Sequence, residues 1–179
     1  MRLFVALELP AELKEAIRVA VEPWRHVSAK WTRPDGLHVT LAFLGETPVE
    51  RLPDLAQRLG EVAAVRAPMR LELAGAGTFG GARPRVLWLG LGGELTRLTE
   101  LAQAVAQALG LPLEPWTGHV TVARARPRQG DEALAEVKAG LSSFRSEPFG
   151  ASELTLFESR GGRYLAQHHA ALSAAHNAS

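Results

Sequence analysis

The sequence predicts an α+β fold of two pseudo-symmetric lobes, each a mainly antiparallel sheet with helices packed outside, around a central cleft. A tetrapeptide of the form His-x-Thr-x occurs twice, at 38–41 and at 119–122. The strand-like and helix-like segments around the first copy recur in the same order around the second, with few of the crossovers that a purely parallel sheet requires. We therefore expect residues 1–179 to form a single bilobal domain built from an internal duplication.

The N-terminal half contains four strand-like and two helix-like segments. Leu13, Ile17 and Ala20 recur at helical spacing in the first helix, and a similar apolar stripe runs through the second. A polar connector at 28–36 precedes the first motif, and Gly45 closes the motif strand. The predicted strands are 2–9, 38–44, 69–76 and 85–91, and the predicted helices are 11–24 and 49–65.

The C-terminal half repeats this order. Gly110 ends its first helix, and a connector with Pro112 and Pro115 leads to the second motif. Phe79 and Phe157 are each followed, six residues later, by an arginine, Arg85 and Arg163, that lies at or directly before the start of a predicted strand, which supports duplication. The predicted helices are 94–109 and 131–141, and the predicted strands are the run that begins at 119 and the runs 152–158 and 164–172.

Composition is that of an ordinary globular protein, with 46% hydrophobic and 22% charged residues. The net charge of +1 excludes a broad polycationic surface, so any nucleic-acid contact should be local. The absence of cysteine excludes disulfides, thiolate metal sites and a cysteine nucleophile. Because the apolar run 1–7 is short and no run reaches about 18 apolar residues, we expect a cytoplasmic protein that makes no membrane contact.

Each motif offers polar chemistry on one face of its strand. Side chains alternate along a strand, so His38 and Thr40 point to one side while Val39 and Leu41 point to the other. His119 and Thr121 repeat this pattern in the second motif. We expect both polar faces to meet in the cleft between the lobes, where ligands commonly bind.

These residues carry a resemblance to a known family. The chain resembles the two-histidine phosphoesterase superfamily and, within it, the bacterial and archaeal 2′-5′ RNA ligases, also described as RNA 2′,3′-cyclic phosphodiesterases. The resemblance covers nearly the whole chain and is carried by 2–7, 37–45, 85–90 and 119–124. It implies a metal-independent enzyme without cofactors that hydrolyses the 2′,3′-cyclic phosphates of RNA ends or small nucleotides to 2′-phosphates. The reverse reaction would form a 2′-5′ RNA linkage.

The residues themselves suit this chemistry. Opening a cyclic phosphate requires a base for water, an acid for the leaving ribose oxygen, and donors around the phosphoryl oxygens. His38 and His119 can fill both proton roles because an imidazole has an ordinary pKa of about 6.5. Thr40 and Thr121 can donate to the phosphoryl oxygens. The resemblance implies that His119 is the base and His38 the acid.

Arg124 is a candidate phosphate ligand with a geometric difficulty. It follows His119 at an odd offset, so a regular strand would turn it to the opposite face. It reaches the cleft only if the strand ends or bulges. The resemblance favours a phosphate contact, and a surface ion pair is the alternative.

Two phenylalanines and two further histidines have competing interpretations. Phe4 and Phe43 could stack on a nucleobase, as aromatic residues do in proteins that bind single-stranded RNA, although core packing is the favoured interpretation. His168 and His169 alternate faces on a predicted strand without other ligands at metal spacing. We interpret them as structural or surface residues.

Two other functions are compatible with the motifs. A metal-dependent phosphodiesterase is disfavoured because threonine is a poor metal ligand and no carboxylate occupies a matching position. An RNA-end binding module would hold phosphate between the histidines without turnover. An internally duplicated site is complete in one chain, so we expect a monomer.

Overall fold

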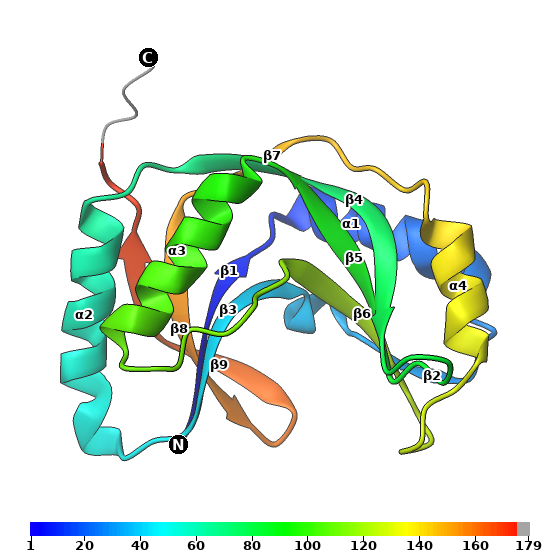
Figure 1. The fold of residues 1–179 in the computed structure, drawn as a ribbon, viewed down its shortest axis with the longest axis horizontal. Helices are drawn as coiled ribbons and strands as arrows, with labels where there is room; N and C mark the ends of the chain where they lie inside the picture. The colour runs from blue at the N-terminus through cyan, green and yellow to red at the C-terminus, as the bar shows by residue number, and fades with distance from the viewer. Residues whose placement is uncertain (175–179) are drawn as a thin grey trace.

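One curled antiparallel sheet of nine strands organises the protein (Figure 1). The structure is a computed structural model that describes residues 1–174. The strand order is β7-β4-β5-β6-β3-β1-β8-β9, and β2 pairs with β6 beside this path. The strands are β1 Arg2–Glu8, β2 Ala29–Trp31, β3 His38–Glu46, β4 Met69–Phe79, β5 Val86–Gly93, β6 His119–Ala125, β7 Phe149–Ala151, β8 Glu153–Arg160 and β9 Arg163–Ala171.

Four α-helices of the described chain flank the sheet in two pairs. In Figure 1, α2 and α3 lie at the left and α1 and α4 at the right. Each helix buries an apolar stripe, as α1 does with Leu13, Ile17 and Val21. The helices are α1 Ala11–Val21, α2 Leu52–Ala64, α3 Leu95–Ala108 and α4 Ala133–Leu141, and short 3₁₀ turns span Glu22–Trp24, Pro34–Gly36 and Val49–Arg51.

The sheet is continuous, which corrects the prediction of a separate sheet in each lobe. The α+β class and the antiparallel pairing are confirmed. The two motif strands join the halves of the sheet, because Val39 of β3 pairs with Val120 of β6. Within residues 1–174 this is the single matched pair between them, and the sheet bends there into two arms. One arm contains β3, β1, β8 and β9, and the other contains β6, β5, β4 and β7.

Each arm combines strands from both halves of the chain. β1 pairs with β8, and β4 pairs with β7. The arms therefore do not follow the two halves of the sequence. Two short strands, β2 and β7, were also missed, because three residues are too few for apolar alternation to be visible.

A β-bulge follows the threonine of each motif. In β3, Thr40 pairs with Ala6 and Ala42 with Val5, which leaves Leu41 as the extra residue. In β6 the matched pairs are Thr121 with Trp88 and Ala123 with Leu87, which leaves Val122 as the extra residue. Since a bulge reverses the alternation of faces, both motif strands change sides at the same position.

The core lies under the motif strands. Val39 and Val120 are 0% exposed, as are Val5 of β1 and Leu89 of β5. Burial of these side chains holds the opposite faces of β3 and β6, which carry the histidines and threonines, away from the core. No helix of the described chain is long and apolar enough to cross a membrane.

Candidate active site

A cleft of about 560 Å³ runs across the two motif strands. Strands and loops line it, and no lining residue comes from the four α-helices. The structure thus brings the two distant motifs together at one site. All seven residues selected from the sequence line this cleft: Phe4, His38, Thr40, Phe43, His119, Thr121 and Arg124.

The antiparallel pairing of β3 with β6 places the histidine of each motif beside the threonine of the other. With Val39 opposite Val120, the antiparallel register brings His38 toward Thr121 and His119 toward Thr40. A smaller adjoining cavity of about 290 Å³ is lined by both Thr40 and His119, in agreement with this register. Each imidazole therefore has its own threonine along the strand and the other motif's threonine across the strands.

Backbone carbonyls orient both rings. His119 Nδ1 lies 2.8 Å from the carbonyl oxygen of Thr117 and donates to it. His38 also forms a hydrogen bond with the backbone of Gly36, and its Nε2 lies 3.0 Å from Thr40 Oγ1. Nδ1 of His119 is thus occupied by the backbone and Nε2 of His38 faces the Thr40 hydroxyl, so we assign proton transfer to the Nε2 atom of each ring.

Aromatic side chains support each histidine. The His38 ring centroid lies 5.1 Å from that of Phe4 and 5.2 Å from that of Tyr164. The His119 centroid lies 5.1 Å from Phe79 and 5.7 Å from Trp88. Such contacts restrict rotation of the rings. No site role was predicted from the sequence for Tyr164, Phe79 or Trp88, which lie on strands one to three positions away from a motif strand in the sheet.

Burial lowers the pKa of His38 to about 4. The charges of His119, Arg124 and Lys14 also lower this pKa, and the hydrogen bond with Gly36 opposes the shift. In the unliganded protein His38 is therefore neutral at pH 7, with its Nε2 able to accept the hydrogen bond of the Thr40 hydroxyl. A phosphate anion bound beside the ring would raise its pKa again.

This shift predicts a pH dependence of stability. Between pH 6.5 and 4 the unfolded chain binds a proton at His38 that the folded chain does not, so stability falls as pH decreases through this window. The full shift corresponds to about 3 kcal/mol. Denaturant unfolding of His38→Asn should show a weaker loss of stability between pH 6.5 and 4 than the parent protein. The control is His26→Asn, at an exposed ring, and the same change in both variants would contradict the prediction.

The bulge in β6 resolves the difficulty with Arg124. Because Val122 is the extra residue, Arg124 returns to the face of His119 and lines the cleft. None of the described carboxylates forms an ion pair with Arg124. Phe43 occupies the corresponding position after the bulge in β3. The two ends of the cleft therefore differ, with a guanidinium at one and an aromatic ring at the other.

The two phenylalanines have different environments. Phe43 is 69% exposed at the edge of the cleft, whereas Phe4 is only 3% exposed. The Phe4 ring stacks on Phe157 with centroids 5.3 Å apart and lies beside His38. Phe43 is therefore the ring with a free surface.

The side chains whose spacing would suit a metal ion lie outside the cleft that contains His38 and His119. In the described chain, one group of three could coordinate a cation, namely Glu8, Glu153 and His169, all exposed. His169 Nδ1 lies 2.8 Å from a Glu153 carboxylate oxygen and 3.1 Å from Thr155 Oγ1. His38 and His119 belong to no such group of described residues.

Two anchored imidazoles, two hydroxyls and an arginine in one cleft are the groups that phosphoryl transfer by acid–base catalysis requires. Known proteins agree with this class. Residues 11–163 match the model of the 2′-5′ RNA ligase superfamily. The chain is 33% identical to an RNA 2′,3′-cyclic phosphodiesterase of Archaeoglobus fulgidus over 88% of both chains, and 31% identical to that of Escherichia coli over 90% of this chain and 89% of the relative.

Solved structures show the same relationship. The structure of E. coli LigT complexed with NADP⁺ superposes with a TM-score of 0.75 at 28% identity, over 97% of this chain and 98% of that one. The complex of LigT with 3′-AMP gives a TM-score of 0.74 at 27% identity with the same coverage. The chain belongs to the 2′-5′ RNA ligase superfamily and is an enzyme of its RNA 2′,3′-cyclic phosphodiesterase family.

Proposed function

We propose that this protein hydrolyses terminal 2′,3′-cyclic phosphates of RNA or small nucleotides to 2′-phosphates, with His38 and His119 as its acid and base. The observation that carries the proposal is the approach of the two motifs in one cleft, with a backbone hydrogen bond to each ring. The Nε2 atoms then exchange protons with a phosphate held between the rings, and at His38 the phosphate takes the place of the Thr40 hydroxyl beside Nε2. Arg124 adds a fixed positive charge at the same place.

The proton transfers can be assigned to particular atoms. His119 Nε2 takes a proton from water while the water oxygen forms its bond to phosphorus. The bond from phosphorus to the ribose 3′ oxygen breaks, and His38 gives that oxygen a proton. Because His38 is neutral in the free protein, it takes up this proton when the phosphate anion binds. Thr40, Thr121 and Arg124 donate to the non-bridging oxygens, where negative charge accumulates.

The aromatic end of the cleft suits the terminal base. Phe43 offers an exposed ring on which a base can stack. The buried ring of Phe4 packs against the His38 ring in the same cleft. In the reverse direction, the same two histidines would join a cyclic-phosphate end to a 5′-hydroxyl through a 2′-5′ linkage. The solved complex of the relative LigT with 3′-AMP supports a nucleotide as the ligand.

Turnover of 2′,3′-cyclic AMP in the presence of EDTA tests this function. The expected product is 2′-AMP, identified by chromatography against 3′-AMP, because the proposed acid protonates the 3′ oxygen. Chelation should leave the rate unchanged, since imidazoles and hydroxyls supply all the proton transfers.

Two outcomes would contradict the proposal. Binding of the cyclic nucleotide without turnover would support an RNA-end binding module instead. Loss of activity with EDTA, restored by one divalent ion, would support a metal-dependent phosphodiesterase. Protein carrying both His38→Ala and His119→Ala is the control for contaminating nucleases.

A further inference from the structure

Several exposed lysine and arginine side chains lie outside the cleft, near the end of β6 that carries Arg124. They lie on β2, beside the start of β5 and in the loop that follows β6. We call this group the cationic edge, and it consists of Lys30, Arg85, Arg126 and Arg128.

Strand pairing brings this group together. Lys30 lies directly opposite Arg124 in the pairing of β2 with β6, so both side chains stand on the face that lines the cleft. On the other side of β6 the amide of Ala125 donates to the carbonyl of Arg85, at 2.9 Å. Lys30 and Arg85 therefore flank the end of β6 at which Arg124 leaves the cleft.

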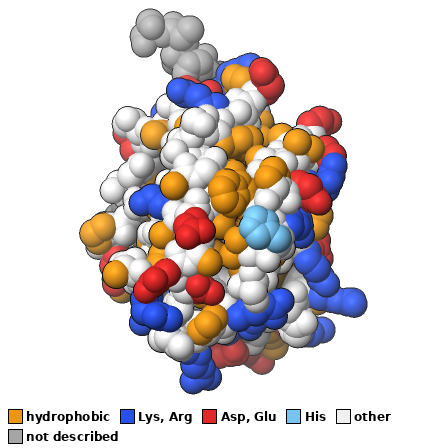
Figure 2. All heavy atoms as spheres, turned by 90° about the vertical axis from the view of Figure 1, so that its right-hand side faces the viewer, with side chains coloured by type: hydrophobic (Ala, Val, Ile, Leu, Met, Phe, Trp, Pro, Cys, Tyr) orange, Lys and Arg blue, Asp and Glu red, His pale blue; other side chains and the backbone are white. Residues whose placement is uncertain are grey.

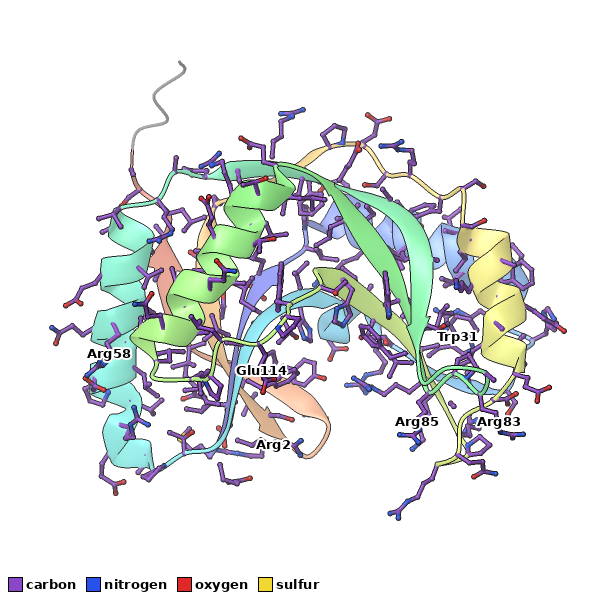
Figure 3. All side chains as sticks on the ribbon, viewed as in Figure 1. Arg2, Trp31, Arg58, Arg83, Arg85 and Glu114 are labelled. Carbon is purple, nitrogen blue, oxygen red and sulfur yellow. The ribbon has the colours of Figure 1, made fainter. Side chains whose placement is uncertain are left out.

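The loop after β6 lies along the hairpin between β4 and β5. The amide of Asp131 donates to the Pro84 carbonyl at 2.9 Å, and Arg83 donates to the Gly130 carbonyl at 3.3 Å. Arg126 and Arg128 belong to this loop. Figure 3 shows Arg83 and Arg85 at the lower end of the hairpin. Figure 2 shows Lys and Arg side chains over the lower part of the face that carries α4.

No described carboxylate neutralises the four cations of the edge. Nearby arginines are paired, Arg83 with Glu132 at 3.8 Å and Arg33 with Asp35 at 3.1 Å. The chain as a whole has a net charge of only +1, so this concentration of unpaired charge is local. Clustered like charges repel one another, and a polyanion relieves that repulsion.

We propose that the cationic edge binds the backbone phosphates of the nucleotides that precede the cyclic-phosphate end, so that the favoured substrates are oligonucleotides. The inference rests on the proposed function. It gives the substrate a direction, because the terminal base stacks on Phe43 at one end of the cleft while the preceding chain leaves past Arg124 at the other. A mononucleotide would fill the cleft but leave the edge empty.

Salt dependence provides the first test. The value of kcat/KM for a tetranucleotide ending in 2′,3′-cyclic phosphate should exceed that for 2′,3′-cyclic AMP at low salt. Each phosphate contact contributes about 0.7 to the slope of log affinity against log salt for a single strand, so three contacts give roughly a 20-fold loss between 50 and 200 mM. The difference between the slopes of the two substrates isolates the edge, because both place one phosphate in the cleft.

A triple variant, Lys30→Gln with Arg85→Gln and Arg126→Gln, provides the second test. It should lower kcat/KM for the tetranucleotide about tenfold or more at low salt, reduce its salt slope, and leave turnover of 2′,3′-cyclic AMP unchanged. Arg70→Gln is the charge control, since Arg70 is exposed at the far end of β4 from the hairpin. Thermal unfolding of each variant verifies the fold.

The outcomes separate this inference from the proposed function. If 2′,3′-cyclic AMP is hydrolysed but the two substrates have equal salt slopes, the proposal that the cationic edge binds RNA phosphates is wrong. The same conclusion follows if the triple variant turns over the tetranucleotide at the normal rate. Failure to hydrolyse either substrate would overturn the proposed function instead. An equal loss in Arg70→Gln would indicate a general effect of net charge and would also overturn the edge.

Discussion

Alanine in place of either cleft histidine is expected to reduce kcat for cyclic-phosphate opening about 10²–10⁴-fold, the contribution of one positioned acid or base. His38→Ala and His119→Ala each remove an imidazole whose Nε2 exchanges a proton with the reacting atoms in the proposed mechanism. Both rings are only partly buried and lie on the cleft face of their strands. Circular dichroism and thermal unfolding should therefore show an intact fold.

A change of leaving group separates the two roles. A nitrophenolate ester leaves without a proton, so His38→Ala should regain most of its lost rate on such a substrate, whereas His119→Ala should remain slow. The opposite pattern would exchange the assignments of acid and base. If either folded variant opened the ordinary cyclic phosphate at a near-normal rate, the two-histidine mechanism would be wrong.

The loss of Arg124 should have the next largest effect. Arg124→Gln removes a cation that lines the cleft and that no described carboxylate neutralises. Donors aimed at developing charge are worth about 10²–10³ in rate, and we expect a decrease of that size in kcat/KM for Arg124→Gln. The measurement is initial-rate kinetics with 2′,3′-cyclic AMP, a substrate that does not reach the cationic edge.

The lysine variant is the matched comparison. Arg124→Lys keeps the charge but loses the planar fork that binds two oxygens, so it should recover only part of the activity. Removal of Arg124 also removes one of the charges that lower the pKa of His38. A normal rate in Arg124→Gln would show that the guanidinium does not contact the phosphate.

The sequence predicted those features that depend on short periodicities. The alternation of His38 and Thr40 with Val39 and Leu41 predicted which face of β3 would be buried, and the second motif repeated it. Helices were predicted from apolar residues at helical spacing, and their boundaries differed only near the ends. All seven selected residues lie at one cleft because each is on, or beside, a motif strand.

Long-range pairing was not predictable in the same way. Nothing local to β1 indicates that its partner is β8 at the other end of the chain, so the arms were expected to follow the two halves of the sequence. The sequence could not decide which face of β6 carries Arg124, because the bulge at Val122 depends on the register with the neighbouring strand. The cationic edge also depends on pairing, since Lys30 is far from Arg124 in the sequence.

The pairing of β1 with β8 has a consequence for how the chain acquires its structure. β1 leaves the ribosome long before its partner β8, so the edge of β1 that pairs with β8 has no partner strand until β8 has been synthesised. Pairings between such distant segments close large loops and slow folding. Neither half of the chain contains a complete arm of the sheet, and a nascent chain that stops before β8 therefore has no finished core around His38.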